Sequence, residues 1–278
     1  MPNTLTGAQA AAAIYAQVRE HAAALDAPPC LAAVSVGAQP DDLAYLHSIA
    51  QAAAGCGVAV RPVPLPADCA PETLTDTLRA LSADGAVHGV LLLRPLPAAL
   101  RAQEILDTLD ARKDVDGMTT ASLGALVTGA AGFAPCTAEA CMELLRAHGI
   151  DPAGRRVTVV GRSLVIGRPA ALLLTRADAT VTLCHRKTSD LATRCRDADI
   201  LLAAAGAPGL ITPDFVRPGQ IVLDAGATAL PDGTLRGDVA SDAAAIAVCT
   251  PVPGGIGSVT TALLLRHTVQ AAENLRHF

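Results

Sequence analysis

The sequence predicts an α/β protein built from two domains, and three observations indicate this fold class. Apolar runs typical of buried strands alternate along the chain with stretches of helical periodicity. The β-branched run at residues 157–160 turns through Gly161 and Gly167 into the apolar stretch 170–174, as a strand, a sharp turn and a helix would. The chain has 278 residues, of which 51% are hydrophobic, so it is long enough to form two cores. We therefore expect an N-terminal α/β domain followed by a doubly wound parallel sheet.

The composition excludes several classes of protein. A formal net charge of -5 argues against nucleic-acid binding. No uninterrupted apolar run approaches the roughly 18 residues of a membrane span, and the N-terminus lacks the basic patch of a secretory signal, so a cytoplasmic location is expected. The eight cysteines are then expected to be reduced thiols, and Cys136 and Cys141 have no further ligands at metal-binding spacing. We expect neither disulfides nor a metal site.

The first half of the chain is predicted to alternate helices with strands. In chain order we predict a helix after the capping-box pattern at residues 6–9, a strand at 31–36, a helix carrying Tyr45 and Ile49, a strand at 58–63, a helix at 71–81 and a strand at 88–94. An amphipathic helix with Ile105, Leu106 and Leu109 follows two prolines. After a Gly/Ala/Thr-rich passage, Thr137 is placed to cap a helix at 139–148, and we put the domain boundary here.

Four apolar runs of the second half predict the parallel sheet. They lie at residues 157–160, 180–184, 199–205 and 220–224, and a last helix is predicted at 259–275. The Gly161 turn offers backbone amides at a helix start to an anion such as a dinucleotide pyrophosphate; the alternative is that its glycines only allow close packing. His185 and Arg186 follow the second strand, where the adenosine ribose of a dinucleotide normally lies, or else they form a solvated turn. The loop at 250–257 either turns the chain or exposes backbone to a flat ligand.

The order and spacing of these motifs resemble those of the methylenetetrahydrofolate dehydrogenase/cyclohydrolase family over nearly the whole chain. The matching motifs are the Tyr45 helix, Pro95-Leu96-Pro97, Asp114-Val115-Asp116-Gly117, Pro135-Cys136-Thr137, Gly161-Arg162-Ser163, Cys184-His185, Gly237-Asp238-Val239 and the run from Thr250 to Gly257. The resemblance implies a folate domain at residues 1–136, completed by the C-terminal helix at about 262–278, and a Rossmann-like NAD(P)-binding domain at 137–261. It also implies a homodimer formed through the Rossmann-like domain, a small-molecule folate as substrate, and no nucleic-acid or membrane partner.

The resemblance further implies which residues form the site. Tyr45 and Asp116 are the implied catalytic residues, although Asp116 could instead cap the turn before Gly117. The implied substrate-binding residues are Tyr45, Ile49, Leu93, Arg94, Asp116, Pro253, Gly254 and Gly255. The implied cofactor-binding residues are Thr137, Gly161, Arg162, Ser163, His185, Arg186, Ala205, Gly206, Ala227 and Thr260. Arg162 and Arg186 could both approach an adenosine 2′-phosphate, and no acidic residue ends the strand at 180–184, so NADP is favoured with NAD as the alternative.

Several positions near the expected substrate depart from the family pattern, and two of them bear on the hydrolytic step. Ile49 stands where the family has a lysine assigned to the hydrolytic step, and Leu93 where it has that lysine's partner glutamine. Hydride transfer needs chiefly the orientation of two rings, whereas opening the methenyl product with water needs a proton donor or acceptor. We therefore expect NADP-dependent oxidation of 5,10-methylenetetrahydrofolate to 5,10-methenyltetrahydrofolate in one-carbon metabolism, with weak or absent cyclohydrolase activity. The alternatives are a repurposed paralogue acting on a different folate-linked or unrelated substrate, and a non-catalytic folate- or nucleotide-binding protein.

Overall fold

Two compact units make up the chain in a computed structural model that describes residues 4–230 and 232–275. One unit contains Ala13–Cys136 and the chain from Thr261 onward; we call it the three-stranded unit after its sheet. The other, the five-stranded unit, contains Thr137–Thr260 and the segment up to Ala12. This segment joins the five-stranded unit because Leu5 N–H donates to Cys249 O at 2.9 Å and Gly7 N–H donates to Gly254 O at 2.9 Å. The division therefore differs from an N-terminal domain that begins at residue 1.

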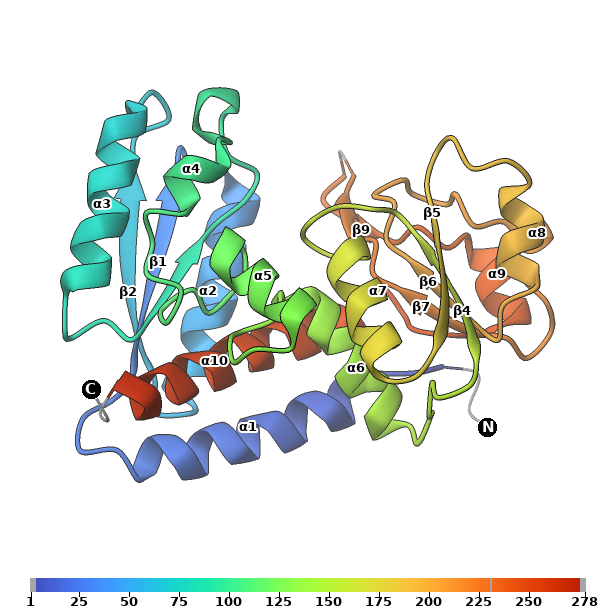
Figure 1. Ribbon diagram of the computed structural model, residues 1–278, viewed down its shortest axis with the longest axis horizontal. Coiled ribbons are helices and arrows are strands. Elements are labelled where there is room, and N and C mark those ends of the chain that lie inside the picture. The colour runs from blue at the N-terminus through green and yellow to red at the C-terminus, as the bar shows by residue number, and fades with distance from the viewer. Residues whose placement is uncertain (1–3, 231, 276–278) are drawn as a thin grey trace. The chain divides into compact units, whose positions relative to one another are not determined.

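The three-stranded unit is a small parallel sheet covered by helices (Figure 1). Its elements are most of α1 (Ala8–Ala23), β1 (Cys30–Val36), α2 (Pro40–Ala54), β2 (Ala59–Leu65), α3 (Pro71–Ala83), β3 (Gly89–Leu92), η1 (Ala98–Leu100), α4 (Gln103–Leu106), α5 (Thr120–Thr128) and most of α10 (Ile256–Leu275). The strand order is β2-β1-β3, and both pairings are parallel. In Figure 1, α3 lies on one side of this sheet and α2 on the other. Gly89 allows a close contact, because a Cβ there would lie 2.8 Å from Val115 and 3.0 Å from the Thr268 hydroxyl of α10.

The five-stranded unit is a doubly wound parallel sheet, as the sequence predicts. Its elements are α6 (Cys136–Ala147), β4 (Arg156–Val160), α7 (Gly167–Arg176), β5 (Thr180–Cys184), α8 (Leu191–Arg196), β6 (Ile200–Ala203), η2 (Pro213–Phe215), β7 (Ile221–Asp224), β8 (Thr228–Ala229), β9 (Leu235–Arg236), α9 (Ser241–Ile246) and β10 (Val248–Cys249). The strand order is β10-β7-β6-β4-β5. Within this unit α7 lies on one face of the sheet, and α8 and α9 lie on the other (Figure 1). The chain thus reverses its winding direction next to β4, where such folds bind ligands.

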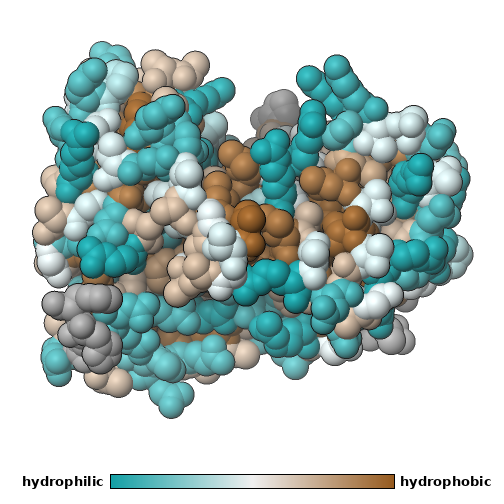
Figure 2. All heavy atoms as spheres, viewed as in Figure 1, coloured by the Kyte–Doolittle hydropathy of each residue, from teal (hydrophilic) through white to brown (hydrophobic). Residues whose placement is uncertain are grey.

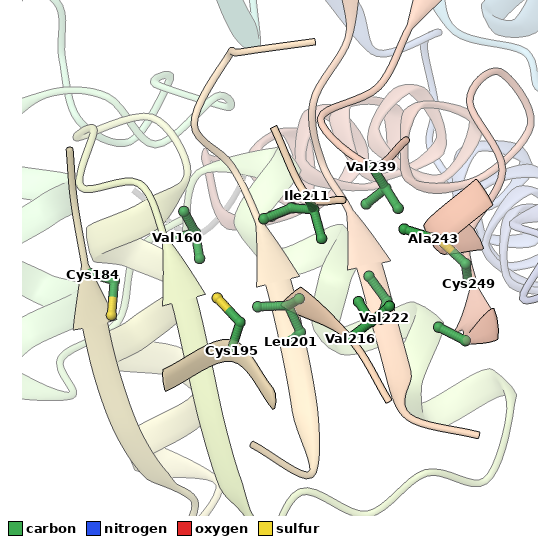
Figure 3. Close-up of a cluster of buried hydrophobic side chains, with 12 residues drawn as sticks. Val160, Cys184, Cys195, Leu201, Ile211, Val216, Val222, Val239, Ala243 and Cys249 are labelled. Carbon is green, nitrogen blue, oxygen red and sulfur yellow. The ribbon is translucent and has the colours of Figure 1, made fainter. Parts of the chain in front are cut away.

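Small apolar side chains fill the core on the α8 and α9 face of this sheet (Figure 3). Val160, Leu201 and Val222 project from three neighbouring strands toward Cys195 of α8 and Ala243 of α9. All five are buried, and the helices approach the sheet closely because these side chains are small. The loops at the carboxyl ends of the strands are therefore carried by a rigid base.

The structure confirms the predicted sheets and corrects some of the predicted helices. The strands predicted at 31–36, 58–63, 157–160 and 180–184 correspond to β1, β2, β4 and β5, and the helix predicted at 71–81 corresponds to α3. The amphipathic helix predicted around Leu106 is wrong, because α4 has four residues and Leu109 N–H donates to Leu106 O in a turn. Leu109 is 4% exposed, so the apolar pattern reports burial rather than a helix.

Two features of the central passage also differ from the sequence prediction. Thr137 does not occupy the N-cap of α6, because that helix begins at Cys136 and Thr137 already lies in its first turn. The Gly/Ala/Thr-rich passage contains an additional helix, α5, which begins after Thr119 and ends at Gly129. The Thr119 hydroxyl caps it by accepting Ser122 N–H at 3.1 Å, and Gly129 has a φ of 77°. A capping threonine and a terminal glycine are therefore the signals that could have predicted α5.

No helix in the described part of the chain is long and apolar enough to cross a membrane.

Candidate functional site

The turn after the buried Lys113 holds two aspartates with different surroundings. The Asp114 carboxylate accepts Thr119 N–H at 2.7 Å and the Ser122 hydroxyl at 2.7 Å, and Asp114 is 2% exposed. These bonds fix the start of α5. The Asp116 carboxylate accepts no backbone N–H from the residues that the structure describes, and Asp116 is half-buried. Asp114, not Asp116, therefore supports the turn, which argues against the capping alternative for Asp116.

Asp116 has a perturbed ionisation because of its surroundings. Burial raises the pKa of its carboxyl group to about 6, and the nearby Asp114 carboxylate acts in the same direction. The Arg94 guanidinium, the nearby Cys136 thiol and the neighbouring His267 oppose this rise in pKa. Asp116 therefore changes charge near pH 6, which is unusual for an aspartate and typical of functional sites.

Cys136 and His267 hold the peptide bond that precedes Asp116. The Cys136 thiol donates to Val115 O at 3.2 Å, and the His267 Nδ1 lies 2.8 Å from the same carbonyl oxygen. The ring of Phe133 stacks on the His267 ring, with a centroid distance of 4.8 Å and an interplanar angle of 29°. The sequence analysis did not select His267, because its place in a regular apolar helix gives no sign of this contact.

Tyr45 lies near Asp116 in the three-stranded unit. The residue is 40% exposed, yet burial around its hydroxyl raises the pKa of Tyr45, and the Asp116 carboxylate raises it further. A hydrogen bond with Thr261 opposes this rise. Tyr45 therefore keeps its proton at neutral pH and can donate a hydrogen bond. The two residues that the sequence analysis selected as catalytic are thus brought together.

The two apolar side chains that the sequence analysis singled out are buried. Ile49, one turn after Tyr45 on α2, is 0% exposed, and Leu93 is 6% exposed. Neither side chain presents a polar atom, so neither donates or accepts a proton. Arg94 is exposed and is close enough to Asp116 to lower its pKa. Ile49 and Leu93 therefore act at most as apolar walls, whereas Arg94 adds a cation.

The Gly161 turn of the five-stranded unit is a point of very close backbone packing. Gly161 has a φ of 120°, and a Cβ there would lie 2.0 Å from Ala204 O. A Cβ on Gly167 would lie 2.1 Å from Gly161 O. Packing therefore requires glycine at both positions, which agrees with the alternative that these glycines only allow close packing. This packing does not exclude a ligand, because it draws β4, α7 and β6 together at the edge where dinucleotides bind.

Ser163 lies four residues before the start of α7, and its side chain bonds to the backbone of the turn that leads into this helix. Its hydroxyl oxygen accepts Ile166 N–H at 3.1 Å and Gly167 N–H at 3.5 Å. The hydroxyl proton stays available to an outside acceptor, and both Ser163 and its neighbour Arg162 are exposed. The turn therefore offers a hydroxyl donor and a guanidinium to an anion.

The end of β5 carries positive charge. Arg186 and Lys187 are exposed, and His185 is half-buried. The His185 Nδ1 accepts Lys187 N–H at 3.2 Å, and the Thr188 hydroxyl accepts His185 N–H at 2.9 Å. These bonds hold the turn, so the two cations project from a defined loop. This geometry suits a phosphate on a ribose.

The remaining expected cofactor residues lie on other parts of the five-stranded unit. Ala205 and Gly206 follow β6 and are exposed, and Ala227 follows β7 and is also exposed. Thr260 lies on α10, and its hydroxyl donates to Ile256 O at 3.2 Å. Thr137 is half-buried in the first turn of α6.

Three of the expected substrate residues belong to the five-stranded unit and not to the unit of Tyr45. They are Pro253, Gly254 and Gly255. A Cβ on Gly255 would lie 2.5 Å from Pro251 O, so this glycine is required by the turn itself. The turning interpretation of the 250–257 loop therefore has a direct structural basis.

Among the residues that the structure describes, no group of three or more His, Cys, Asp or Glu side chains could hold a metal ion.

Comparison with known proteins identifies the family on both halves of the chain. The profile of the tetrahydrofolate dehydrogenase/cyclohydrolase catalytic domain matches residues 5–116. The profile of the NAD(P)-binding domain of the same family matches residues 135–276. Together the two profiles cover most of the chain.

Relatives with assigned names match over nearly their whole length. The chain is 47% identical over 279 aligned residues to "Bifunctional protein FolD 1" of Rhodococcus jostii, covering 98% of this chain and 93% of that protein. It is 46% identical over 260 residues to "Bifunctional protein FolD" of Chloroflexus aurantiacus, covering 92% of this chain and 90% of that protein.

Solved structures show the same fold. The bifunctional methylenetetrahydrofolate dehydrogenase/cyclohydrolase of Campylobacter jejuni superposes with a TM-score of 0.93 at 37% identity, covering 98% of this chain and 99% of that one. The corresponding Trypanosoma brucei enzyme, complexed with NADP cofactor and an inhibitor, superposes with a TM-score of 0.92 at 34% identity, covering 99% and 98%.

Proposed function

Because the chain belongs to the tetrahydrofolate dehydrogenase/cyclohydrolase family, we propose that it oxidises 5,10-methylenetetrahydrofolate to 5,10-methenyltetrahydrofolate with NADP. The observation that carries this proposal is the Asp116 carboxylate, which stands beside Tyr45 and is free of the structural duty that Asp114 performs. A carboxylate that served packing alone would not need to lie beside a second ionisable side chain such as Tyr45. The repurposed paralogue and the non-catalytic binder have no observation in their favour.

The residues of the five-stranded unit fit a dinucleotide. A pyrophosphate could bind at the Gly161 turn, where the backbone packs closely. The exposed Ser163 hydroxyl and the exposed Arg162 guanidinium could donate hydrogen bonds to it. The exposed Arg186 at the end of β5 suits a 2′-phosphate, so NADP is preferred to NAD. When bound, NADP supplies the acceptor of the hydride.

Asp116 and Tyr45 would act on the folate. The methenyl product carries a positive charge that the methylene substrate lacks. An ionised carboxylate stabilises that charge as it develops, and the pKa of about 6 means that Asp116 is ionised at neutral pH. It can also accept hydrogen bonds from the pterin amino and ring N–H groups. Tyr45 keeps its proton and can donate a hydrogen bond to the substrate.

The cyclohydrolase step is proposed to be weak. It requires water to add to the methenyl carbon and a nearby group to take up the proton. Ile49 and Leu93 have no atom that can do so, and they are almost fully buried. A guanidinium such as that of Arg94 is a poor proton acceptor. The methenyl product should consequently accumulate.

Purified protein supplied with methylenetetrahydrofolate and NADP should show the absorbance of NADPH and of the methenyl product rising together. The double variant Ile49→Lys with Leu93→Gln should speed methenyl hydrolysis at least about tenfold and change hydride transfer much less, because it restores a proton-transfer group. The matched control, Ile49→Leu with Leu93→Met, adds no polar atom and should leave both rates near those of the native protein. If neither absorbance changes in the native protein or in the double variant, the proposed activity is wrong.

A homodimer through the five-stranded unit is part of the proposal. The strand β5 is an edge of the sheet, and Leu183 on it is 39% exposed. Leu172 and Leu173 of α7 are half-buried, and Figure 2 shows hydrophobic side chains gathered over α7 and β5. An unpaired edge beside an apolar surface favours a self-complementary contact with a second copy. A cytoplasmic location is also proposed, and cell fractionation would test it.

A further inference from the structure

Three consecutive backbone amides after β6 converge on one buried carboxylate. The Asp238 Oδ2 accepts Ala205 N–H at 2.6 Å and Gly206 N–H at 3.0 Å, and its Oδ1 accepts Ala207 N–H at 2.7 Å. Asp238 is 0% exposed, and it lies 33 residues from Ala205 in the sequence. Successive N–H groups that point into one concavity form an anion-binding nest. Here the nest is filled by a side chain of the protein itself.

A second carboxylate holds Asp238 in place. The Asp224 Oδ1 accepts Asp238 N–H at 2.9 Å and Gly226 N–H at 3.0 Å, and its Oδ2 accepts Val239 N–H at 3.0 Å. The fit is tight, because a Cβ on Gly226 would lie 2.5 Å from the Asp238 carboxyl carbon and one on Gly237 would lie 2.0 Å from the Asp224 Oδ2. The position of the Asp238 carboxylate is therefore set by the end of β7 and not by the loop that it binds.

This arrangement decides which atoms the loop presents to a ligand. The N–H and C=O of a trans peptide point in opposite directions, so amides turned inward to Asp238 leave the carbonyls of Ala205 and Gly206 turned outward. Among the described residues no N–H donates to these two carbonyl oxygens. Both residues are exposed, and Gly206 has a φ of 63° with no atom near its Cβ position. The outer face of the loop is therefore rich in acceptors.

The strand order indicates which part of the cofactor meets this face. With the pyrophosphate at the end of β4 and the adenosine at the end of β5, the other half of the dinucleotide extends over β6. That half carries ribose hydroxyls and a carboxamide, which donate hydrogen bonds.

We propose that Asp238 is a positioning residue that fills the amide nest of the Ala205–Gly206–Ala207 loop and so makes this loop accept donors from the nicotinamide riboside half of the cofactor. This inference rests on the proposed function, because it takes a nicotinamide dinucleotide as the ligand. It adds that the loop selects hydrogen-bond donors and rejects anions.

The test compares two ligands by equilibrium titration of the full chain, without folate. In Asp238→Asn one carboxylate oxygen becomes an NH₂ group that faces the amides, so the loop should lose its shape. The affinity for NADPH should fall at least about tenfold, while that for adenosine 2′,5′-bisphosphate, which does not reach β6, should stay within about twofold. The control Asp242→Asn, at an exposed aspartate whose one side-chain hydrogen bond among the described residues is accepted from Ala243 N–H, should leave both affinities unchanged.

An equal loss of affinity for both ligands, or an unchanged NADPH affinity, would overturn the inference while leaving the proposed function intact. Failure of the native protein to bind NADPH at all would overturn both the inference and the proposed function.

Amide hydrogen exchange in the native protein without cofactor gives a second measurement that needs no variant. The amides of Ala205, Gly206 and Ala207 should exchange slowly although the loop is exposed, and fast exchange would contradict the role of Asp238.

Discussion

Replacing Asp116 by asparagine should stabilise the three-stranded unit at neutral pH. The pKa of Asp116 is about 6 in the folded protein, whereas the ordinary value for an aspartate is 3.8. The difference of about 2 pKa units corresponds to about 3 kcal/mol, and we take this as an upper value because Asp116 is half-buried and not fully enclosed. The asparagine has nearly the same shape and no charge, so it avoids the penalty of burying an ionised group.

The sign of the effect depends on pH in a defined way. Above about pH 6 the carboxyl group is ionised in both the folded and the unfolded chain, and the folded chain bears the full penalty. Below the unfolded pKa of roughly 4 both states are protonated, and the penalty vanishes. The advantage of Asp116→Asn should therefore grow from near zero at acidic pH to its full value at neutral pH.

Urea unfolding followed by tyrosine fluorescence measures this effect in the correct part of the molecule. The chain has two tyrosines and no tryptophan, and both Tyr15 and Tyr45 belong to the three-stranded unit. The control Asp84→Asn should show the opposite sign, because hydrogen bonds from Ala86 N–H and Arg61 lower the pKa of Asp84. A gain for Asp116→Asn that is the same at acidic and neutral pH, or no gain at either, would refute the assigned surroundings of Asp116.

Two further predictions concern the five-stranded unit. Arg186→Ser should raise the KM for NADP about tenfold and leave the KM for NAD nearly unchanged, because the guanidinium would pair with the 2′-phosphate. Steady-state kinetics with both cofactors measures the two KM values, and equal changes in them would contradict the prediction. Leu183→Lys places a charge on the exposed edge strand and should shift the protein from dimer to monomer in sedimentation at micromolar concentration, with Lys187→Leu as a control outside β5. A native protein that sediments as a monomer would refute the dimer itself.

The two aspartates of the turn after Lys113 show where sequence reasoning ends. Asp114 and Asp116 are two residues apart, and either could cap a turn or bind a ligand. The structure separates them, because Thr119 and Ser122 fold back onto Asp114 and leave Asp116 beside Arg94 and the Cys136 thiol. Asp238 is a stronger example, since its sequence motif carries no sign of the loop that it binds 33 residues away.

The sequence by itself determined the parallel sheet of the five-stranded unit, the alternation of helices and strands in the three-stranded unit, and the glycine turn between β4 and α7. Alternation of apolar and polar residues and the steric freedom of glycine act over a few neighbouring residues, so they can be recognised without coordinates. Only the tertiary structure decided that Ile49 is fully buried, that α4 is a single turn, and that the Ala205 loop closes on Asp238. These features depend on which distant segments meet, and hydrogen bonding and burial between such segments leave no local pattern in the chain.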